Sequence, residues 1–278
     1  MFERMTKITV AFAVIALLGT VNLCLAQTSS GAINGTITDS TGAVIPGVNI
    51  EITNTGTGEK RKISTTETGS YTISNLTVGV YNVTATGTGF ALSTAKDVKV
   101  SVAFTTTVNL TLNAAGASEV VEVSSGDAQT QINTTDQQLS TLIDNRKILD
   151  LPLLNRDPNS LILLAPGAIQ TTSRLGGFSV NGSRERNNNF LVDGADNNDT
   201  DVPGGAGGLS TPNIDATQEF RVITSNFNAE YGRNTGAIIN IVTKGGTNEF
   251  HGGVYLNYRS DRFAARDFFD VSGETDPL

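Results

Sequence analysis

Residues 47–53 read Gly47-Val48-Asn49-Ile50-Glu51-Ile52-Thr53 and alternate apolar with polar side chains. This period of two is typical of a β-strand with one buried face and one solvated face. The same alternation recurs in residues 81–85, 98–102 and 108–112. Turn-forming stretches such as Asp39-Ser40-Thr41-Gly42 separate these runs. Because about seven strands at this spacing can bury their apolar faces only against a second sheet, residues 31–113 are predicted to form a β-sandwich.

Two tyrosines of this stretch, Tyr71 and Tyr81, lie in phase with the apolar positions. Aromatic residues in phase with a core face usually pack inside, so we interpret both as core residues and not as sugar-stacking residues. The remaining composition fits a strand-rich chain, because glycine is abundant with 29 residues and few stretches show helical periodicity.

The sandwich stretch resembles the carboxypeptidase-regulatory-like domain, a prealbumin-like or Ig-like fold. The matching positions are Gly35, Asp39, Gly42, Pro46, Gly47, Gly69, Tyr71, Leu76, Gly79, Tyr81 and Phe90. The resemblance implies an accessory domain that is sometimes grouped with carbohydrate-binding folds. It does not imply peptidase activity, because a zinc carboxypeptidase binds its metal through two His and a Glu, and this chain has one His.

The N-terminus is interpreted as an export signal over residues 1–26. Arg4 and Lys7 precede an apolar run from Ile8 to Leu18, and small residues near Ala26 suit a signal peptidase. The run is shorter than the about 20 residues that a membrane-spanning helix needs. Lipid attachment at Cys24 is the alternative, but Leu23 stands where that chemistry prefers a small residue.

The rest of the chain has few groups for chemistry. Removing residues 1–26 takes away the single cysteine, one of 27 acidic residues and two of 19 basic residues, which leaves a net charge of −9. This excludes disulfides and thiol nucleophiles and argues against nucleic-acid binding. We expect no enzyme activity, no catalytic residues, no cofactor and no bound metal.

Residues 125–245 are predicted to form a mixed α+β domain. Asp157-Pro158 suits a helix start, and Pro166-Gly167 suits its end. A short helical turn is expected over residues 145–152, and Asp215 with Gln218 is a possible capping box. The expected strands are residues 177–181, 189–193, 219–224 and 237–243.

Three stretches suggest ligand sites but have simpler interpretations. The acidic run from Asp193 to Asp201 lacks the glycine and glutamate spacing of an EF-hand, so Asp193-Gly194 is interpreted as a turn. The run from Gly204 to Gly208 lacks the Lys-Ser/Thr ending of a P-loop and is interpreted as a loop. His251 has no second His or Cys with which to share a metal and is interpreted as a strand residue.

The α+β stretch is similar to the plug of TonB-dependent outer-membrane receptors, most closely of the Oar-like group. The matching strings are LPLLNRDPNSLILLAPG (151–167), FSVNGSRERNNNFLVDGADNND (178–199) and DATQEFRVITSNFNAEYGRNTGAIINIVTKGGTNEFHGG (215–253). In that family the plug fills the lumen of a large barrel. The polar stretch from Asn181 to Asn189 would then face the barrel wall, although a solvated loop explains it as well.

Between the two domains, residues 114–124 contain a short strand-like segment, with three interpretations open. It could be a linker, the first strand of the second domain, or a strand offered to a partner by sheet-edge addition. Its core is similar to a TonB box. The candidate partner-binding residues are Glu119, Val120, Val121, Glu122 and Val123. The resemblance implies a periplasmic TonB-type energy-transducing protein as partner.

Residues 246–278 are interpreted as the start of a barrel, because residues 251–259 alternate again. Only 28 residues follow Phe250, too few to close a barrel, so we expect a fragment of a longer receptor or a truncated product. The resemblance implies an outer-membrane location, with plug and sandwich on the periplasmic side, and an extracellular ligand such as a glycan or peptide. The alternative function is a secreted or surface carbohydrate-binding, adhesive β-sandwich protein without a transport role.

Overall fold

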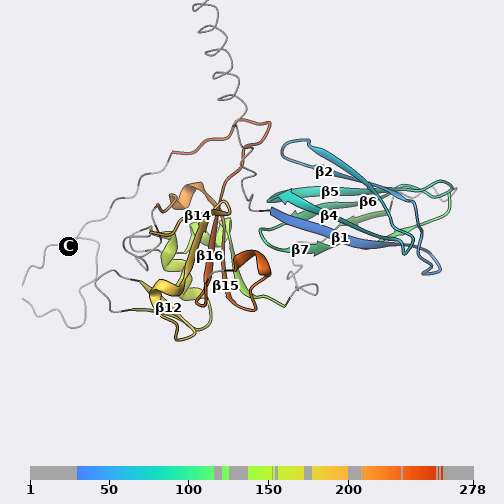
Figure 1. Cartoon of the computed structure of the whole chain (residues 1–278). Coiled ribbons are helices and arrows are strands. Elements are labelled where there is room, and N and C mark those ends of the chain that lie inside the picture. The colour runs from blue at the N-terminus through green and yellow to red at the C-terminus, as the bar shows by residue number, and fades with distance from the viewer. Residues whose placement is uncertain are drawn as a thin grey trace, which may run out of the picture.

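The computed structural model describes residues 30–115, 121–124, 137–151, 153, 156–171, 177–199, 208, 210–232, 234–254, 256 and 258. These residues form two β-rich domains that lie side by side (Figure 1). The predicted export signal at residues 1–26 lies outside the described residues. Within the described part, no helix is both long enough and apolar enough to cross a bilayer.

The first domain is a sandwich of two sheets, which confirms the predicted fold. One sheet contains β4 (Ser70–Thr77), β1 (Ser30–Asp39), β7 (Thr105–Thr107) and β8 (Leu110–Leu112). The other sheet has the order β3 (Lys60–Ser64), β2 (Asn49–Asn54), β5 (Gly79–Thr86), β6 (Ser93–Val100) and β9 (Val121–Ser124). Strand β4 runs antiparallel to β1, whereas β7 and β8 run parallel to it.

The apolar positions of both sheets meet in one core, as the alternation predicts. Its fully buried members include Ile33, Ile37, Ile50, Ile52, Val83 and Leu110. Tyr71 and Tyr81 are only 2% and 3% exposed, which confirms them as packing residues. Each hydroxyl is satisfied inside the domain, because Tyr71 donates to the carbonyl of Val108 at 2.7 Å and Tyr81 to the carbonyl of Thr77 at 2.8 Å.

Gly35 of β1 allows the closest approach in this core. A Cβ atom at this position would lie 1.8 Å from the carbonyl oxygen of Val108 and 2.9 Å from Cε1 of Tyr71. Neither distance is compatible with van der Waals packing. The glycine therefore allows β1 to pass under the tyrosine ring whose hydroxyl reaches the same carbonyl.

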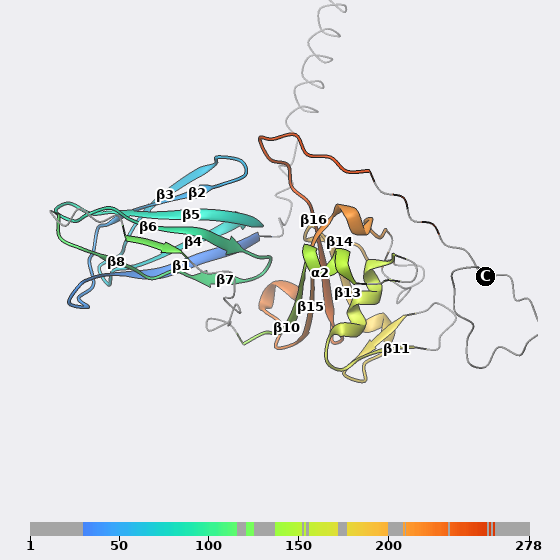
Figure 2. The same ribbon diagram turned by 180° about the vertical axis from the view of Figure 1, so that it is seen from behind.

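The second domain is built on a mixed sheet with short helices, as expected for an α+β domain. Its order is β10 (Leu139–Asp144), β15 (Thr217–Ser225), β16 (Ile238–Thr243), β13 (Asn189–Val192) and β14 (Ala195–Asp196). A separate hairpin pairs β11 (Ala168–Gln170) with β12 (Phe178–Val180). Figure 2 shows α2 (Asn145–Asp150) over the sheet, where Ile148 is fully buried.

The helix starts agree with the sequence in two of three cases. Asp144 caps α2, and Asp157 caps the 3-10 helix η1 (Pro158–Leu164) by accepting from the amide of Asn159. The predicted capping box at Asp215 is wrong. Asn213 caps the 3-10 helix η3 (Ile214–Ala216), and Gln218 belongs to strand β15. The turn is too short for the residue three positions later to reach back, because the chain already enters a central strand.

The polar stretch from Asn181 to Asn189 is only partly solvated. Arg184 and Arg186 are exposed, whereas Asn188 and Asn189 are buried. The Asn188 side chain donates to the carbonyl of Phe178 at 2.6 Å and accepts from the amide of Ala237 at 2.9 Å. It therefore connects backbone groups inside the domain and faces neither solvent nor an external wall.

The other ligand-like stretches have structural roles where they are described. Asp193 and Gly194 both have positive φ, 50° and 80°, which confirms the turn between β13 and β14. The Asp193 carboxylate accepts from the amide and the hydroxyl of Thr243. No cluster of three or more His, Cys, Asp or Glu occurs among the described residues. The glycine-rich run lies outside them except for Gly208.

The strand expected near the C-terminus is not formed by the described residues there. Residues 251–254, 256 and 258 have no strand pairing, and Val254, Leu256 and Tyr258 are 104%, 92% and 77% exposed. His251 is likewise not in a strand. A β-strand needs a neighbouring strand for its backbone hydrogen bonds, and none of the described strands pairs with this segment. The barrel strand stays a prediction.

Candidate functional site

Strand β9 contains three of the five candidate partner-binding residues. Val121, Glu122 and Val123 lie in it, whereas Glu119 and Val120 lie outside the described residues. The strand pairs in parallel with β6, with Val121 opposite Ser93 and Ser124 opposite Lys96. The segment thus belongs to the sandwich sheet and is not the first strand of the second domain.

The position of β9 is an edge of the five-stranded sheet. Its one neighbour among the described strands is β6, which is held on its other side by antiparallel pairing with β5. An edge strand has one row of backbone groups without a ladder partner, and such a row can accept a further strand. The geometry that sheet-edge addition requires is therefore present at residues 121–124.

The two domains meet at a joint that sequence patterns did not reveal. Figure 1 shows the β7 end of the sandwich facing the second domain. There the turn Ser101–Phe104, which connects β6 to β7, lies against β15. Ser101 and Val102 are 0% and 1% exposed, so the turn is buried in the contact.

Glu219 of β15 binds this turn through both carboxylate oxygens. Oε1 accepts from the hydroxyl of Ser101 at 2.9 Å, and Oε2 accepts from the amide of Val102 at 3.0 Å. The side chain is 1% exposed. Burial raises the pKa of Glu219, while these two hydrogen bonds and the charges of Lys99 and Arg221 act in the opposite direction.

Arg221, two residues further along β15, binds the same turn. Its Nη1 donates to the carbonyls of Val102 and Ala103, and its Nη2 donates to the hydroxyl of Ser140 at 2.9 Å. The guanidinium carbon also lies 5.9 Å from the centroid of the Phe104 ring, within the range of a cation–π contact. Ala103 has a φ of 49°, a left-handed conformation that the bonds from Arg221 to the carbonyls of Val102 and Ala103 help to hold.

A second contact lies at the β2–β3 turn. The backbone amide of Asn248 donates to the carbonyl of Gly56 at 3.0 Å, and its side-chain amide donates to the carbonyl of Thr57 at 2.6 Å. The segment after β16 therefore binds one turn of the sandwich while β15 binds another.

The joint was missed because charged residues in a strand usually face water. Glu219 and Arg221 alternate with Phe220 and Val222 in the predicted strand, which is the pattern of a half-exposed strand. In the structure both faces are buried. Phe220 and Val222 lie in the core of the second domain, and Glu219 and Arg221 lie against the turn of the sandwich. An acidic and a basic residue two positions apart, alternating with Phe220 and Val222, were the available signal.

The comparisons with known proteins agree with this architecture. Residues 32–113 match the family model of the carboxypeptidase regulatory-like domain, and the sandwich is therefore a domain of that family. Over most of its length the chain is homologous to the TonB-dependent transporter Oar of Myxococcus xanthus, with 30% identity over 240 residues. The matched region is 82% of this chain and 22% of the relative, so the chain spans about a fifth of that protein's length.

Solved structures overlap with smaller parts of the chain. The outer membrane transporter YddB from Escherichia coli is 16% identical, with a TM-score of 0.33, over 38% of this chain and 17% of that chain. The Bacillus anthracis TIE protein is 20% identical, with a TM-score of 0.27, over 31% of this chain and 17% of that chain. These partial overlaps carry no functional argument. The sequence relationship to a transporter agrees with the expectation of a non-enzymatic role.

Proposed function

We propose that this chain is the N-terminal part of a TonB-dependent outer-membrane transporter. In this proposal the second domain is the plug, residues 246–278 begin the barrel, and Glu119–Val123 is the segment that a periplasmic TonB-type protein binds. The observation that carries it is the homology to a TonB-dependent transporter over a region that includes both domains. The edge position of β9 supports the partner-binding role of the segment.

The mechanism would be conformational. A TonB-type protein would pair with the backbone of residues 119–123 by strand addition, in which main-chain hydrogen bonds supply the affinity. Force applied there would act on the domain that fills the pore. This role needs backbone groups that can pair and a fold that resists unfolding, and it needs no catalytic residue.

The test of the partner is a competition experiment. A synthetic peptide of residues 117–125 should bind the periplasmic domain of a TonB-type protein and compete with the whole chain. The matched control peptide carries Val121→Pro, because proline lacks the backbone donor and should weaken binding at least tenfold. In the whole chain, replacement of residues 119–123 by Gly-Ser-Gly-Ser-Gly should abolish binding. Undiminished binding after that replacement would show that the partner contacts another part of the chain.

A further inference from the structure

The turn between β2 and β3 has its backbone donors occupied within the sandwich. The amides of Gly56 and Thr57 both donate to Oδ1 of Asn54, at 2.9 and 3.0 Å. The other three amides of the turn also donate to groups of the sandwich; they belong to Thr55, Gly58 and Glu59. Asn54 is only 6% exposed, so the residue that orders the turn belongs to the sandwich interior. The turn therefore offers a ligand carbonyl oxygens and not amides.

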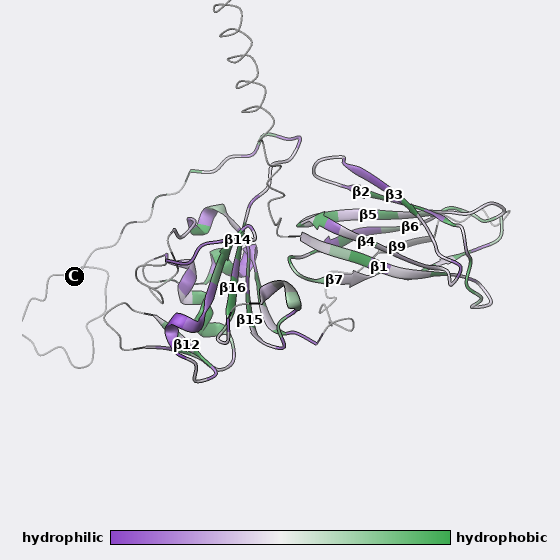
Figure 3. Cartoon of the chain, in the orientation of Figure 1, coloured by the Kyte–Doolittle hydropathy of each residue, from purple (hydrophilic) through white to green (hydrophobic). Residues whose placement is uncertain are grey.

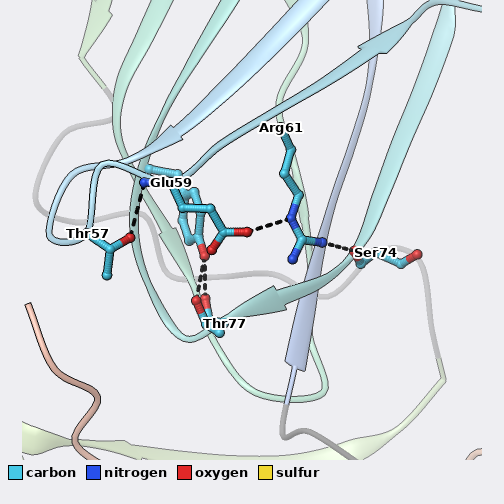
Figure 4. A network of polar contacts seen from close by, with 6 residues as sticks. Thr57, Glu59, Arg61, Ser74 and Thr77 are labelled. Carbon is cyan, nitrogen blue, oxygen red and sulfur yellow. Dashed lines mark hydrogen bonds and ion pairs between the residues drawn. The ribbon is translucent and has the colours of Figure 1, made fainter. Parts of the chain in front are cut away.

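Side chains of β3 and β4 support this turn from the sandwich side. Figure 4 shows the hydroxyl of Thr57 accepting from the amide of Glu59 at 3.3 Å, and the carboxylate of Glu59 beside the guanidinium of Arg61 at 3.0 Å. Nη1 of Arg61 also donates to the carbonyl of Ser74 in the opposite sheet, at 3.4 Å. Figure 3 colours β3 as hydrophilic along this surface. Because all these bonds lie within the sandwich, the turn is formed without help from the second domain.

The segment that meets this turn supplies donors. The hydroxyl of Thr247 donates to the carbonyl of Glu249 at 3.0 Å and accepts from its amide at 3.4 Å, which makes a local turn. Asn248, at the centre of that turn, donates twice to the sandwich, from its backbone amide to Gly56 and from its side-chain amide to Thr57. Gly56 allows the approach, since a Cβ there would lie 3.2 Å from Cγ2 of Thr247.

A pair of glycines, Gly245 and Gly246, separates β16 from this contact. The chain is still fixed at Lys244, whose amide donates to the carbonyl of Ala216 at 2.8 Å. A Cβ at either glycine would meet nothing within 4 Å, so packing does not restrain the chain there. Glycine without close neighbours can adopt many backbone directions. The second domain by itself therefore does not determine where the chain goes after residue 246.

We propose that the β2–β3 turn is an acceptor surface that binds Thr247 and Asn248 and thereby fixes the direction in which the chain leaves the second domain. Figures 1 and 2 show the segment after β16 beside this turn from opposite sides. The partner that the surface fits is a short turn with an asparagine at its centre, because that residue supplies two donors to two neighbouring carbonyls. The inference goes beyond the proposed function and does not depend on it.

Amide hydrogen exchange at residue 248, measured by NMR on the whole chain at pH 7, tests this proposal. Asn248→Asp keeps the shape of the side chain but replaces its donor with a carboxylate, which repels the carbonyl of Thr57. Exchange at residue 248 should become at least fivefold faster after correction for the intrinsic rate, because the amide loses its acceptor when the segment detaches. The matched control Asn228→Asp adds the same charge at an exposed position of the second domain and should leave this rate unchanged.

A variant in the sandwich tests the same contact from the other side. Gly56 does not have a positive φ, so alanine suits its backbone, but the added methyl crowds Cγ2 of Thr247. Gly56→Ala should therefore speed exchange at Asn248, in the other domain, at least threefold. Thr247→Ser removes Cγ2 and keeps the hydroxyl, so Gly56→Ala/Thr247→Ser should return the rate to within about twofold of the native chain.

Three results would overturn the proposal. The first is exchange at Asn248 in the native chain as fast as in an unstructured peptide. The second is a native rate in Asn248→Asp, and the third is a native rate in Gly56→Ala. None of these results bears on the proposed function, because each concerns only the contact between the sandwich and residues 247–248.

Discussion

Replacing Glu219 with alanine removes both acceptors with which β15 holds the turn between β6 and β7. The amide of Val102 would be left buried without its acceptor, since Val102 is 1% exposed. An unsatisfied buried donor costs about 1–3 kcal/mol, and a hydrogen bond to a charged group is worth about 1.5–3 kcal/mol. Release of the carboxylate from its desolvated position offsets part of this loss, as the direction of its pKa shift shows. We expect Glu219→Ala to lower the free energy of unfolding by about 2–4 kcal/mol.

Glutamine at the same position is the matched control. Its carbonyl oxygen can accept from Val102, and its amide can donate to the Ser101 hydroxyl, which is able to act as an acceptor. Glu219→Gln should therefore change the free energy of unfolding by about 1 kcal/mol or less. Urea denaturation of the whole chain at pH 7, followed by circular dichroism, measures both values. Equal losses for alanine and glutamine would show that the charge, and not the two hydrogen bonds, maintains the joint, and no loss for alanine would show that the joint contributes nothing.

Four further results are expected. The pKa of Glu219 in the folded chain is raised above its ordinary value of 4.5, so the folded chain binds this proton more tightly than the unfolded chain does. Protonation of Glu219 therefore stabilises the fold. This stabilisation is complete below pH 4.5 and is lost as the pH rises through the folded-state pKa. The difference in unfolding free energy between native chain and Glu219→Gln should accordingly fall as the pH rises from 4.5 towards neutrality. Tyr71→Phe leaves the carbonyl of Val108 without its donor and should cost about 1–2 kcal/mol in urea denaturation. Asn188→Ala removes two buried backbone contacts and should cost about 2–4 kcal/mol, with a lower midpoint of thermal unfolding. Gly35→Ala should cost about 3 kcal/mol or more, measured in the same way, because the added methyl meets backbone that cannot move aside.

Local patterns located several elements of both domains. Alternation located β2 and β5, and the Asp157-Pro158 pair located η1. These predictions succeeded because each signal acts within a few residues: side chains two apart share a strand face, and a cap bonds to amides next to it in the chain. The same limited range explains the wrong capping box at Asp215, where entry into a central strand ended the helical turn early.

Residue patterns alone were enough to place a β-sandwich ahead of an α+β domain and to assign many of the side chains that fill the core of the sandwich. The packing of the folded chain was needed to learn that Glu219 and Arg221 face the sandwich and that residues 121–124 lie on β6. The physical reason is that a strand's sequence specifies which face is apolar but not which neighbour its backbone pairs with, because main-chain hydrogen bonds are alike at every residue. A charged side chain in a strand can likewise form its hydrogen bonds with water or with a distant turn. Only the packing of the two domains decides which of these partners it has.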